Sequence, residues 1–525
     1  MRFYIENFGC RATQADGAAL ERQFLNRGME RASGAGEAEL AVLNSCTVTA
    51  GADKDVRASI RRLQRINPGC RILVTGCYAQ RAPEELAALP GVTWVVGNSH
   101  KHLAAEIAAT PFKSGGFVPV EKLSGAPDRF PPFRKEREKV GQPSRLEPLG
   151  NVFVGDIFAH TELLAAPVFE AANERTRPNL KVQDGCDNRC SFCVIPFVRG
   201  ASRSLAAERV IAEIRTLVDA GYREVVISGI NLGRWGRDLP ADRSSLSAIR
   251  KGGLLSEEGL YANSERRIAN SAYPTPNDQR LLHLIRAILT ETDLEKLRIS
   301  SVEPMDWSRE LIDLVASSPR IAKHAHVPMQ SGSDAVLRRM HRKYRPWHYR
   351  EKIAQIRSAM PQAAIGADVM VGFPGESDDE FEETRRIVEE LPFTYLHVFT
   401  YSARPGTPAA SHPNQVPASV ARKRNSVLRE LASAKKGAFL RSLVGREVEA
   451  ITLQSGGADF TEALTDNYVK VEIAGRLTAN RWMRVRVQQV EGDMLIADSE
   501  SPRKNDQAGH GERSYSWGHD TADGR

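Results

Sequence analysis

The stretch that decides the fold reads Gly185-Cys186-Asp187-Asn188-Arg189-Cys190-Ser191-Phe192-Cys193. It places three cysteines with three and then two residues between them. Structural zinc sites usually have four ligands in paired Cys-x-x-Cys or Cys/His units, and four thiolates saturate a four-iron cluster. No fourth cysteine follows nearby, so the spacing favours a cubane with one iron open to a small molecule. The alternative is an incomplete zinc ribbon or a chance cluster.

A second set of cysteines, Cys10, Cys46 and Cys77, lies in the first 80 residues, and each follows a short apolar run. The runs are Phe3–Ile5, Leu40–Leu43 and Ile72–Val74. Such runs, each followed by turn residues and a helical pattern, are typical of parallel strands. Because the carboxyl ends of adjacent parallel strands lie at one edge of a sheet, the sequence predicts that these cysteines converge into one triad. A single buried cysteine is commonly an inert thiol, and we expect Cys70, the seventh, to be one.

The sequence motifs around both cysteine sets resemble those of the methylthiotransferases of the radical S-adenosylmethionine (SAM) superfamily. The decisive motifs are Asn-Ser-Cys-Thr-Val-Thr (44–49), Thr-Gly-Cys-Tyr-Ala-Gln (75–80) and the cysteine run at 183–193. Further matching motifs lie at 228–233, 298–304, 326–333 and 368–376. These motifs are most similar to those of the tRNA-modifying branch, whose members act on N6-threonylcarbamoyladenosine. The resemblance covers most of residues 1–110 and 180–500.

The resemblance implies two [4Fe-4S] clusters and SAM as cofactors. Cys186, Cys190 and Cys193 would hold the cluster that cleaves SAM, and Cys10, Cys46 and Cys77 would hold a second cluster that supplies sulfur. SAM would serve both as methyl donor and as radical source. The expected SAM contacts are Phe192, Ser228, Gly229, Glu303, Gln330, Ser331 and Gly372. From the residues alone, Glu303 before a proline can instead cap a turn, and a Gly-Pro turn such as that at Gly372 is weak evidence for a site.

The implied reaction is insertion of a methylthio group at C2 of N6-threonylcarbamoyladenosine at position 37 of tRNA. The expected partners are the tRNA anticodon stem-loop, an electron donor such as flavodoxin or ferredoxin, and a sulfur donor. Two alternatives stay open: a methylthiotransferase acting on a ribosomal protein side chain, and a non-enzymatic iron–sulfur module for electron transfer or RNA binding. No catalytic side chain is assigned.

Composition agrees with a large cytoplasmic enzyme. Hydrophobic residues make up 41% and charged residues 26% of the 525 residues, which is ordinary globular usage and allows a sizeable core. There is no apolar run long enough to span a membrane and no signal-peptide core at the start, and reducing cytoplasm keeps thiols free for metal. The net charge of +7 permits a polyanionic partner. Basic clusters at 337–345, 422–424 and 435–436 are candidate phosphate contacts or ordinary solvated helix faces.

The predicted fold class is α/β in three parts: a parallel-sheet βα domain, an incomplete (β/α)6 radical SAM barrel and a small C-terminal β-barrel. The barrel assignment rests on six strand-like runs separated by helical stripes, with the chemistry expected at the carboxyl ends of the strands. These runs are Leu180–Gln183, Glu224–Ser228, Leu297–Ser301, His324–Pro328, Ile365–Val371 and Tyr395–Tyr401.

Domain boundaries follow from shifts in composition and period. We expect an N-terminal methylthiotransferase domain at 1–110, a linker or insertion at 111–178, the radical SAM barrel at 179–415 with an inserted loop at 240–277, a basic helix at 416–443, a TRAM-like β-barrel at 444–500 and a disordered tail at 501–525. The small barrel resembles the RNA-binding domain of the family, and small barrels commonly bind oligonucleotides. The alternative for it is a purely structural cap.

Overall fold

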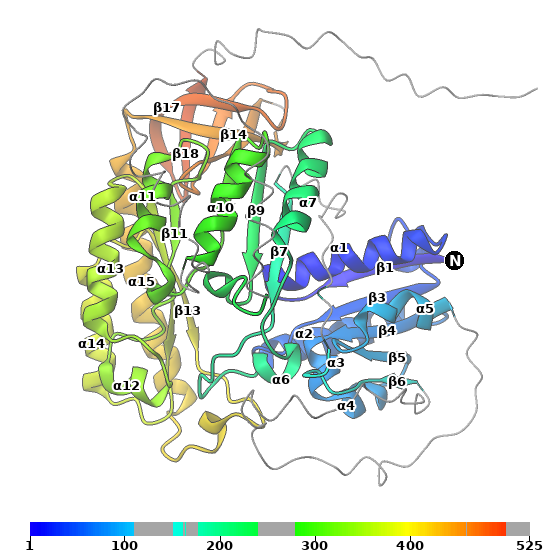
Figure 1. The fold of residues 1–525 in the computed structure, drawn as a ribbon. Coiled ribbons are helices and arrows are strands. Elements are labelled where there is room, and N and C mark those ends of the chain that lie inside the picture. Colours follow the sequence, from blue (N-terminus) through cyan, green and yellow to red (C-terminus); the bar gives the residue numbers. More distant parts are fainter. Residues whose placement is uncertain (110–150, 161–162, 164–176, 240–278, 458, 500–525) are drawn as a thin grey trace, which may run out of the picture. The chain divides into compact units, whose positions relative to one another are not determined.

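A computed structural model describes residues 1–109, 151–160, 163, 177–239, 279–457 and 459–499. The expected features within 111–150, the inserted loop at 240–277 and the tail at 501–525 lie outside the described residues. The chain divides into two compact units, Met1–Lys436 and Gly437–Arg525, which are described separately (Figure 1). Within the described part of the chain, no helix is long and apolar enough to cross a membrane.

The first unit begins with a six-stranded parallel sheet in the order β2-β1-β3-β4-β5-β6. Its strands are β1 (Arg2–Asn7), β2 (Glu30–Arg31), β3 (Leu40–Ser45), β4 (Arg71–Gly76), β5 (Val92–Gly97) and β6 (Val152–Phe153). The central strand β3 is buried along its whole length, as expected for a parallel sheet covered on both faces. The edge strand β6 comes from within the stretch that composition predicts to be a linker. The predicted N-terminal parallel sheet is confirmed.

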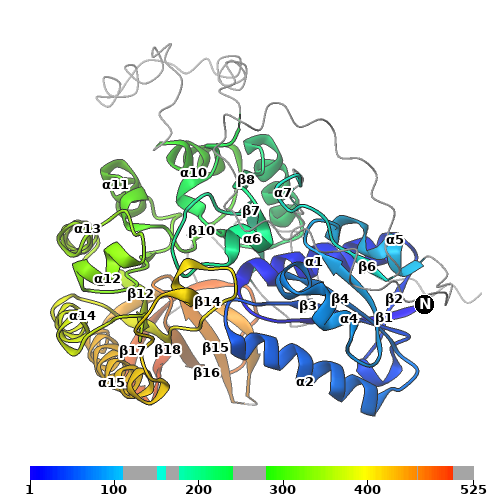
Figure 2. The ribbon, with the colours of Figure 1, turned by 90° about the horizontal axis from the view of Figure 1, so that it is seen from below.

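Helices cover both faces of this sheet (Figure 2). They are α1 (Arg11–Asn26), α2 (Ala50–Ile66), α3 (Cys77–Arg81), α4 (Pro83–Ala87) and α5 (Ala104–Ala109). Phe24 of α1 packs in one core cluster with Val42, and Ile60 of α2 packs in another with Leu43. Because Val42 and Leu43 are neighbours on β3, their side chains point to opposite faces of the sheet. The two faces are therefore buried by different helices.

Six further parallel strands form the second part of this unit. They are β7 (Asn179–Asp184), β9 (Glu224–Gly229), β10 (Lys296–Ile299), β11 (His324–His326), β12 (Ala364–Val371) and β13 (Tyr395–Thr400). They pair as β10-β9-β7 and β11-β12-β13, and bridges such as Ser301 to His326 join the two groups. The short strand β8 (Arg203–Ser204) runs antiparallel at the outer side of β7. The six parallel strands match the predicted incomplete barrel.

One face of these strands packs against helices that follow them in the chain (Figures 1 and 2). The helices of this region are α6 (Ile195–Arg199), α7 (Ala207–Asp219), α10 (Arg280–Glu291), α11 (Arg309–Ser317), α12 (Asp334–Arg339), α13 (Pro346–Ala359), α14 (Asp378–Glu390) and α15 (Ala418–Ser442). Ala325 and Ala367 on the strands share a core with Ile353 of α13 and Ile387 of α14. Since side chains alternate along a strand, the neighbouring polar residues of β11 and β12 face the other side, away from the helices.

The second unit contains a closed five-stranded barrel in the order β14-β15-β16-β18-β17. Its strands are β14 (Glu447–Gly456), β15 (Phe460–Thr465), β16 (Lys470–Ala474), β17 (Trp482–Glu491) and β18 (Met494–Ser499). A core that includes Val471, Val485 and Leu495 fills it, together with Leu440 and Leu443 at the end of α15. Closure removes exposed sheet edges, and it confirms the predicted small β-barrel.

Candidate cluster and cofactor sites

The loop that carries Cys186, Cys190 and Cys193 leaves the carboxyl end of β7. Gly185 turns the chain there with a φ of 70°, and a Cβ on it would lie 2.0 Å from the carbonyl oxygen of Ala201. Two backbone hydrogen bonds fix the loop, from the amide of Cys186 to Gly200 O at 3.1 Å and from the amide of Cys193 to Cys190 O at 3.1 Å. Only glycine fits the first position of this turn.

The three thiols of this loop lie close enough for their charges to interact. Burial raises the pKa of Cys186 to about 11, and the charge of Cys190 adds to the rise. Burial likewise raises the pKa of Cys193 to about 12, with the charges of Cys190 and Cys186 acting in the same direction. Cysteine ligates metal as a thiolate, so a metal bound by these thiols would displace their protons. Three converging thiols with no built-in fourth are the donor set expected for a cluster with one open iron.

Two polar side chains contact these sulfurs, and sequence reasoning assigned neither of them. Asn231 Nδ2 donates to Cys186 Sγ at 3.7 Å, and the Arg342 guanidinium donates to Cys190 Sγ at 3.3 Å. Arg342 also forms an ion pair with Glu303 and is 8% exposed. The predicted SAM contact Glu303 therefore lies beside the cysteine loop, held by a buried cation. Asn231 could have been found in the motif at 228–233, whereas Arg342 is hidden among the other cations of the run at 337–345.

Polar atoms without partners lie near the same strand ends. Ser228 Oγ, Asn231 Oδ1 and Gln330 Oε1 are buried and, within the described residues, have no hydrogen-bond partner. Gln330 also has a φ of 65°, a strained value for a residue with a side chain. A Cβ on Gly229 would lie 2.8 Å from Gln183 Oε1, so no side chain fits there. Buried polar atoms are normally satisfied, so these groups suit a polar ligand such as SAM.

The remaining predicted SAM contacts have protein partners. The Ser331 hydroxyl lies 3.1 Å from Thr384 Oγ1 of α14, on the helix side of the barrel. Gly372 directly follows β12 with a φ of 74°, and a Cβ on it would lie 2.6 Å from Ala421 Cβ of α15. Phe192 is partly buried and packs against the barrel core. The Ser331 hydroxyl therefore has a partner within the protein, and the close approach of α15 accounts for glycine at position 372.

The N-terminal cysteines lie at the ends of three adjacent strands. Cys10 is the N-cap residue of α1, shortly after β1, Cys46 follows β3, and Cys77 begins α3 directly after β4. Burial raises the pKa of Cys46 to about 12, and the charges of Cys77 and Cys10 raise it further. A Cβ on Gly9 would lie 2.7 Å from Cys46 Sγ, so the backbone of the first loop approaches the second cysteine closely. The predicted convergence of the three cysteines agrees with this geometry.

Side chains from both parts of the first unit surround this triad. Thr13 Oγ1 lies 3.6 Å from Cys10 Sγ. Asn98 Nδ2 donates to Cys77 Sγ at 3.6 Å and to the carbonyl oxygen of Val198 in α6 at 2.7 Å. The amide of Asn98 therefore joins a cysteine of the N-terminal sheet to the barrel.

A buried ion network lies next to this triad. Asp16 of α1 pairs with Lys101 at 2.9 Å, with Arg199 at 3.0 Å and with Lys181 of β7. Asp184 pairs with the same Lys181 at 2.7 Å and with Arg199 at 3.0 Å. These cations hold the pKa of Asp16 and of Asp184 well below the ordinary value, although burial alone would raise it. The network ties the N-terminal sheet to the first barrel strand.

The basic runs are largely used inside the first unit. Arg339 pairs with Glu380 at 2.6 Å, and Arg424 pairs with Glu376 at 2.7 Å. Lys435 donates to the carbonyl oxygens of Glu389 and Leu391, each at 2.8 Å. Acidic side chains and backbone carbonyl groups already engage these members of the clusters at 337–345, 422–424 and 435–436, and their role as phosphate contacts stays a prediction.

Comparisons with known proteins show to which family the chain belongs. Residues 2–97 match the model of the uncharacterized protein family UPF0004, and residues 254–388 match that of the radical SAM superfamily. The threonylcarbamoyladenosine tRNA methylthiotransferase MtaB of Bacillus subtilis is 34% identical, over 90% of this chain and 90% of that protein. The chain belongs to the MtaB methylthiotransferase family. The Aquifex aeolicus member of this family is 31% identical, over 93% of this chain and the whole of that protein.

Other relatives of this chain have lower sequence identity to it. The tRNA-2-methylthio-N(6)-dimethylallyladenosine synthase of Syntrophobacter fumaroxidans is 28% identical over 94% of this chain and 95% of that protein. Among solved structures, the radical S-adenosylmethionine methyltransferase TsrM of Kitasatospora setae has a TM-score of 0.46 and 14% identity, over 78% of this chain and 76% of that one. Radical SAM enzymes use SAM with a [4Fe-4S] cluster, and methylthiotransferases carry two such clusters.

Proposed function

We propose that this protein inserts a methylthio group at C2 of N6-threonylcarbamoyladenosine at position 37 of tRNA. The observation that carries the proposal is the presence of two separate cysteine triads at strand ends of one compact unit, in a chain of the MtaB family. The family relationship does not favour the alternatives of a ribosomal protein substrate or a non-enzymatic module.

The first triad, Cys186, Cys190 and Cys193, is proposed to hold the SAM-cleaving cluster. Its surroundings support this role, because Arg342 and Asn231 donate to two of its sulfurs and charge-assisted donors stabilise thiolates. For SAM itself, we propose polar contacts by Ser228, Glu303 and Gln330. We propose two further kinds of contact with SAM. The backbone would approach it closely at Gly229, Ser331 and Gly372, and the Phe192 ring would make an apolar contact.

The second triad, Cys10, Cys46 and Cys77, is proposed to hold the sulfur-supplying cluster. Arg199 faces Cys77 and Cys10 with its charge, and Lys101 faces Cys77. When bound, the two clusters and SAM supply one-electron cleavage of the sulfonium, the methyl group and the sulfur. The chain contributes fixed cations, hydrogen-bond donors and a buried setting that shields the reaction from water.

For the tRNA, we propose that the anticodon loop presents the target base and that the second unit holds the stem. Bases in a single-stranded loop expose their edges and faces to a protein. Arg481 and Arg484 of the second unit are exposed, as phosphate contacts require. An external one-electron donor, such as flavodoxin or ferredoxin, and a sulfur donor complete the cycle. We place the reaction in the cytoplasm, where reducing conditions preserve thiolate ligands.

Mass spectrometry of tRNA nucleosides tests this function. A strain without the gene should accumulate N6-threonylcarbamoyladenosine and lose its 2-methylthio derivative, and the wild-type gene should restore the derivative. Cys186→Ala and Cys46→Ala should each fail to restore it. Cys70→Ala is the matched control, because Cys70 is a buried cysteine outside both triads, and it should restore the product. Retention of the methylthio derivative in the deletion strain would contradict the assigned substrate.

A further inference from the structure

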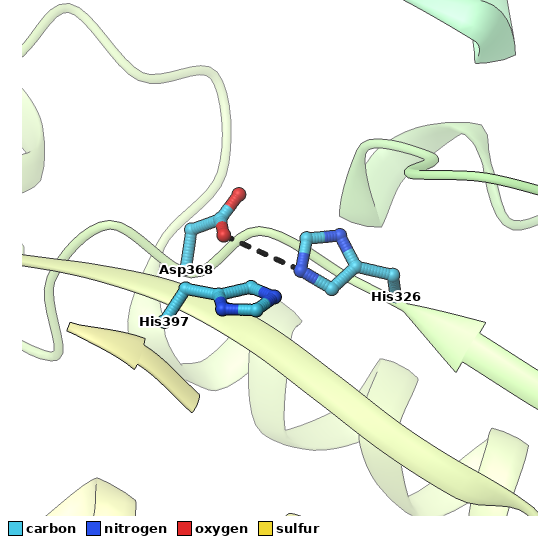
Figure 3. A group of neighbouring side chains, drawn as sticks. All are labelled: His326, Asp368 and His397. Atoms are coloured by element: carbon cyan, nitrogen blue, oxygen red, sulfur yellow. Dashed lines mark ion pairs between the residues drawn. The ribbon is translucent and has the colours of Figure 1, made fainter. Parts of the chain in front are cut away.

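Three side chains that belong to neither triad meet on one face of the barrel strands. His326 lies on β11, Asp368 on β12 and His397 on β13, and these strands are consecutive neighbours. Asp368 is directly opposite His397 in the strand register, and His326 is opposite Gly366, two residues before Asp368. One ligand atom from each side chain lies within 4.8 Å of the other two (Figure 3).

The group is accessible from the face of the sheet that the helices do not cover. Neighbouring residues Ala325, Ala367 and Val369 pack into the core on the helix side, so the three polar side chains point the other way. His326 and Asp368 retain 12% and 27% of their side-chain exposure, and His397 is exposed. An ion held here would therefore keep coordination positions open.

The His326 ring is fixed in position, but its Nε2 atom makes no hydrogen bond within the described residues. His326 Nε2 lies 3.3 Å from Asp368 Oδ1, yet this buried nitrogen has no hydrogen-bond partner among the described residues. Tyr395 stacks on the His326 ring with centroids 6.0 Å apart and an angle of 13°. Tyr395 is fixed in turn, because its hydroxyl lies 2.7 Å from His324 Nε2. The ring is thus positioned by stacking rather than by a hydrogen bond to the carboxylate.

We propose that His326, Asp368 and His397 form a mononuclear site for a divalent transition-metal ion, separate from both clusters. Two imidazoles and one carboxylate are the donor set of open zinc sites and of open ferrous sites. The cation whose charge reaches this group is Arg11, and its effect on His397 is weaker than the opposing effect of the Asp368 carboxylate. Metal ligation would also engage His326 Nε2, which makes no hydrogen bond within the described residues.

Zinc binding to the cluster-loaded enzyme tests this site without any dependence on tRNA or SAM. After removal of loose metal with a chelator, equilibrium dialysis against Zn²⁺ should show one saturable zinc ion per chain that depends on the group. Asp368→Asn, which keeps the shape, and His397→Ala should each weaken this zinc binding at least tenfold. Asp379→Asn at an exposed position and His412→Ala at a half-buried one are matched controls outside the group, and they should bind zinc like wild type.

X-ray absorption fine structure at the zinc edge identifies the ligands, since iron has no absorption edge at that energy. Shells at about 2.0–2.2 Å from nitrogen and oxygen support the site, whereas sulfur at about 2.3 Å assigns the ion to cysteine. Sulfur ligation, the absence of a saturable zinc ion, or equal zinc affinity in Asp368→Asn and wild type would each overturn the proposal.

Discussion

Arg342 is buried between the Cys190 sulfur and the Glu303 carboxylate. A fixed positive charge beside a cluster thiolate favours reduction, because reduction adds negative charge to the cluster. Its neighbours in the sequence serve other purposes, since Arg338 and Arg345 pair with Asp334. Arg342 therefore differs from these neighbours, because only its guanidinium contacts a cluster-loop sulfur, and we propose that it influences the cluster's potential.

Replacing Arg342 with Gln should make the potential of the SAM-cleaving cluster more negative. We expect a shift of roughly 60 mV, about a tenfold change in the equilibrium constant of a one-electron couple. Redox titration followed by electron paramagnetic resonance measures this shift in a background in which Cys10, Cys46 and Cys77 are Ala. Arg342→Lys should retain most of the wild-type potential, and Arg345→Gln should leave it unchanged. An unaltered potential in Arg342→Gln would show that this charge does not tune the cluster.

Single residues also mark the limit of prediction from sequence. The six cysteines proposed as cluster ligands could be singled out because each follows an apolar run or lies in a compact motif. His326, Asp368 and His397 could not be grouped, because alternation along a strand gives the face of each residue but not which strands adjoin. Arg342 and Asp16 were missed for a related reason: a charged residue in a helical or basic stretch carries no sign that it is buried.

Among the secondary-structure elements, the turn after β12 packs closely against helix α15. Gly372 has a positive φ and lies against Ala421, and its amide donates to Glu376 Oε2 at 2.7 Å. Arg424 of α15 donates to the same carboxylate at 2.7 Å. The strand, the turn and the helix therefore share one buried contact.

Gly372→Ala should destabilise the first unit by about 2–5 kcal/mol. About 1–2 kcal/mol comes from the left-handed backbone and about 1–3 kcal/mol from overpacking. Thermal unfolding of the cluster-free protein should show a lower midpoint. Adding Ala421→Gly removes the opposing methyl group, so the double variant should be more stable than the two single effects predict. Simple additivity of the two effects would exclude the methyl contact as a cause.

Elements were predicted better than their ends. The predicted strand His324–Pro328, for example, ends at His326 in the structure. Strand β6 was not predicted, since two residues that join a sheet edge have no period of their own. Barrel strands were found because they are apolar on the helix side, which the pattern of the sequence reveals directly.

Across the whole molecule, the network of Asp16, Lys101, Lys181, Asp184 and Arg199 joins parts of the first unit that are far apart in sequence. Its two carboxylates have pKa values held below the ordinary range. Their contribution to stability is therefore present above the unfolded-state pKa of about 4 and lost as the pH falls further.

Asp16→Asn should lower the stability of the first unit by about 3–5 kcal/mol at neutral pH, because it leaves buried cations unpaired. It should also flatten the loss of stability below about pH 4. Thermal midpoints of the cluster-free protein from pH 3 to 7 measure both effects. Asp55→Asn on the exposed side of α2 is the control. A variant as stable as wild type at pH 7 would show that the network contributes no net stability.

Deletion of Gly437–Arg525 should weaken tRNA binding and flatten its dependence on salt, because fewer phosphate contacts release fewer counterions. Iron content should stay the same, since all six cluster cysteines precede the deletion. Filter binding across a salt series and iron analysis measure these outcomes. If the shortened protein binds tRNA as tightly as the full chain at every salt concentration, the small barrel has only a structural role.

The two triads differ in how their ligands are gathered, and this difference bears on assembly. Cys186 and Cys193 lie 7 residues apart, whereas Cys10 and Cys77 lie 67 apart and meet only when three strands have paired. Closing the longer loop costs about 2 kcal/mol more entropy. The compact loop can thus capture iron while the chain is still incomplete, and the dispersed triad must await a folded sheet. Under rising denaturant, the sulfur-supplying cluster should be the first to be lost.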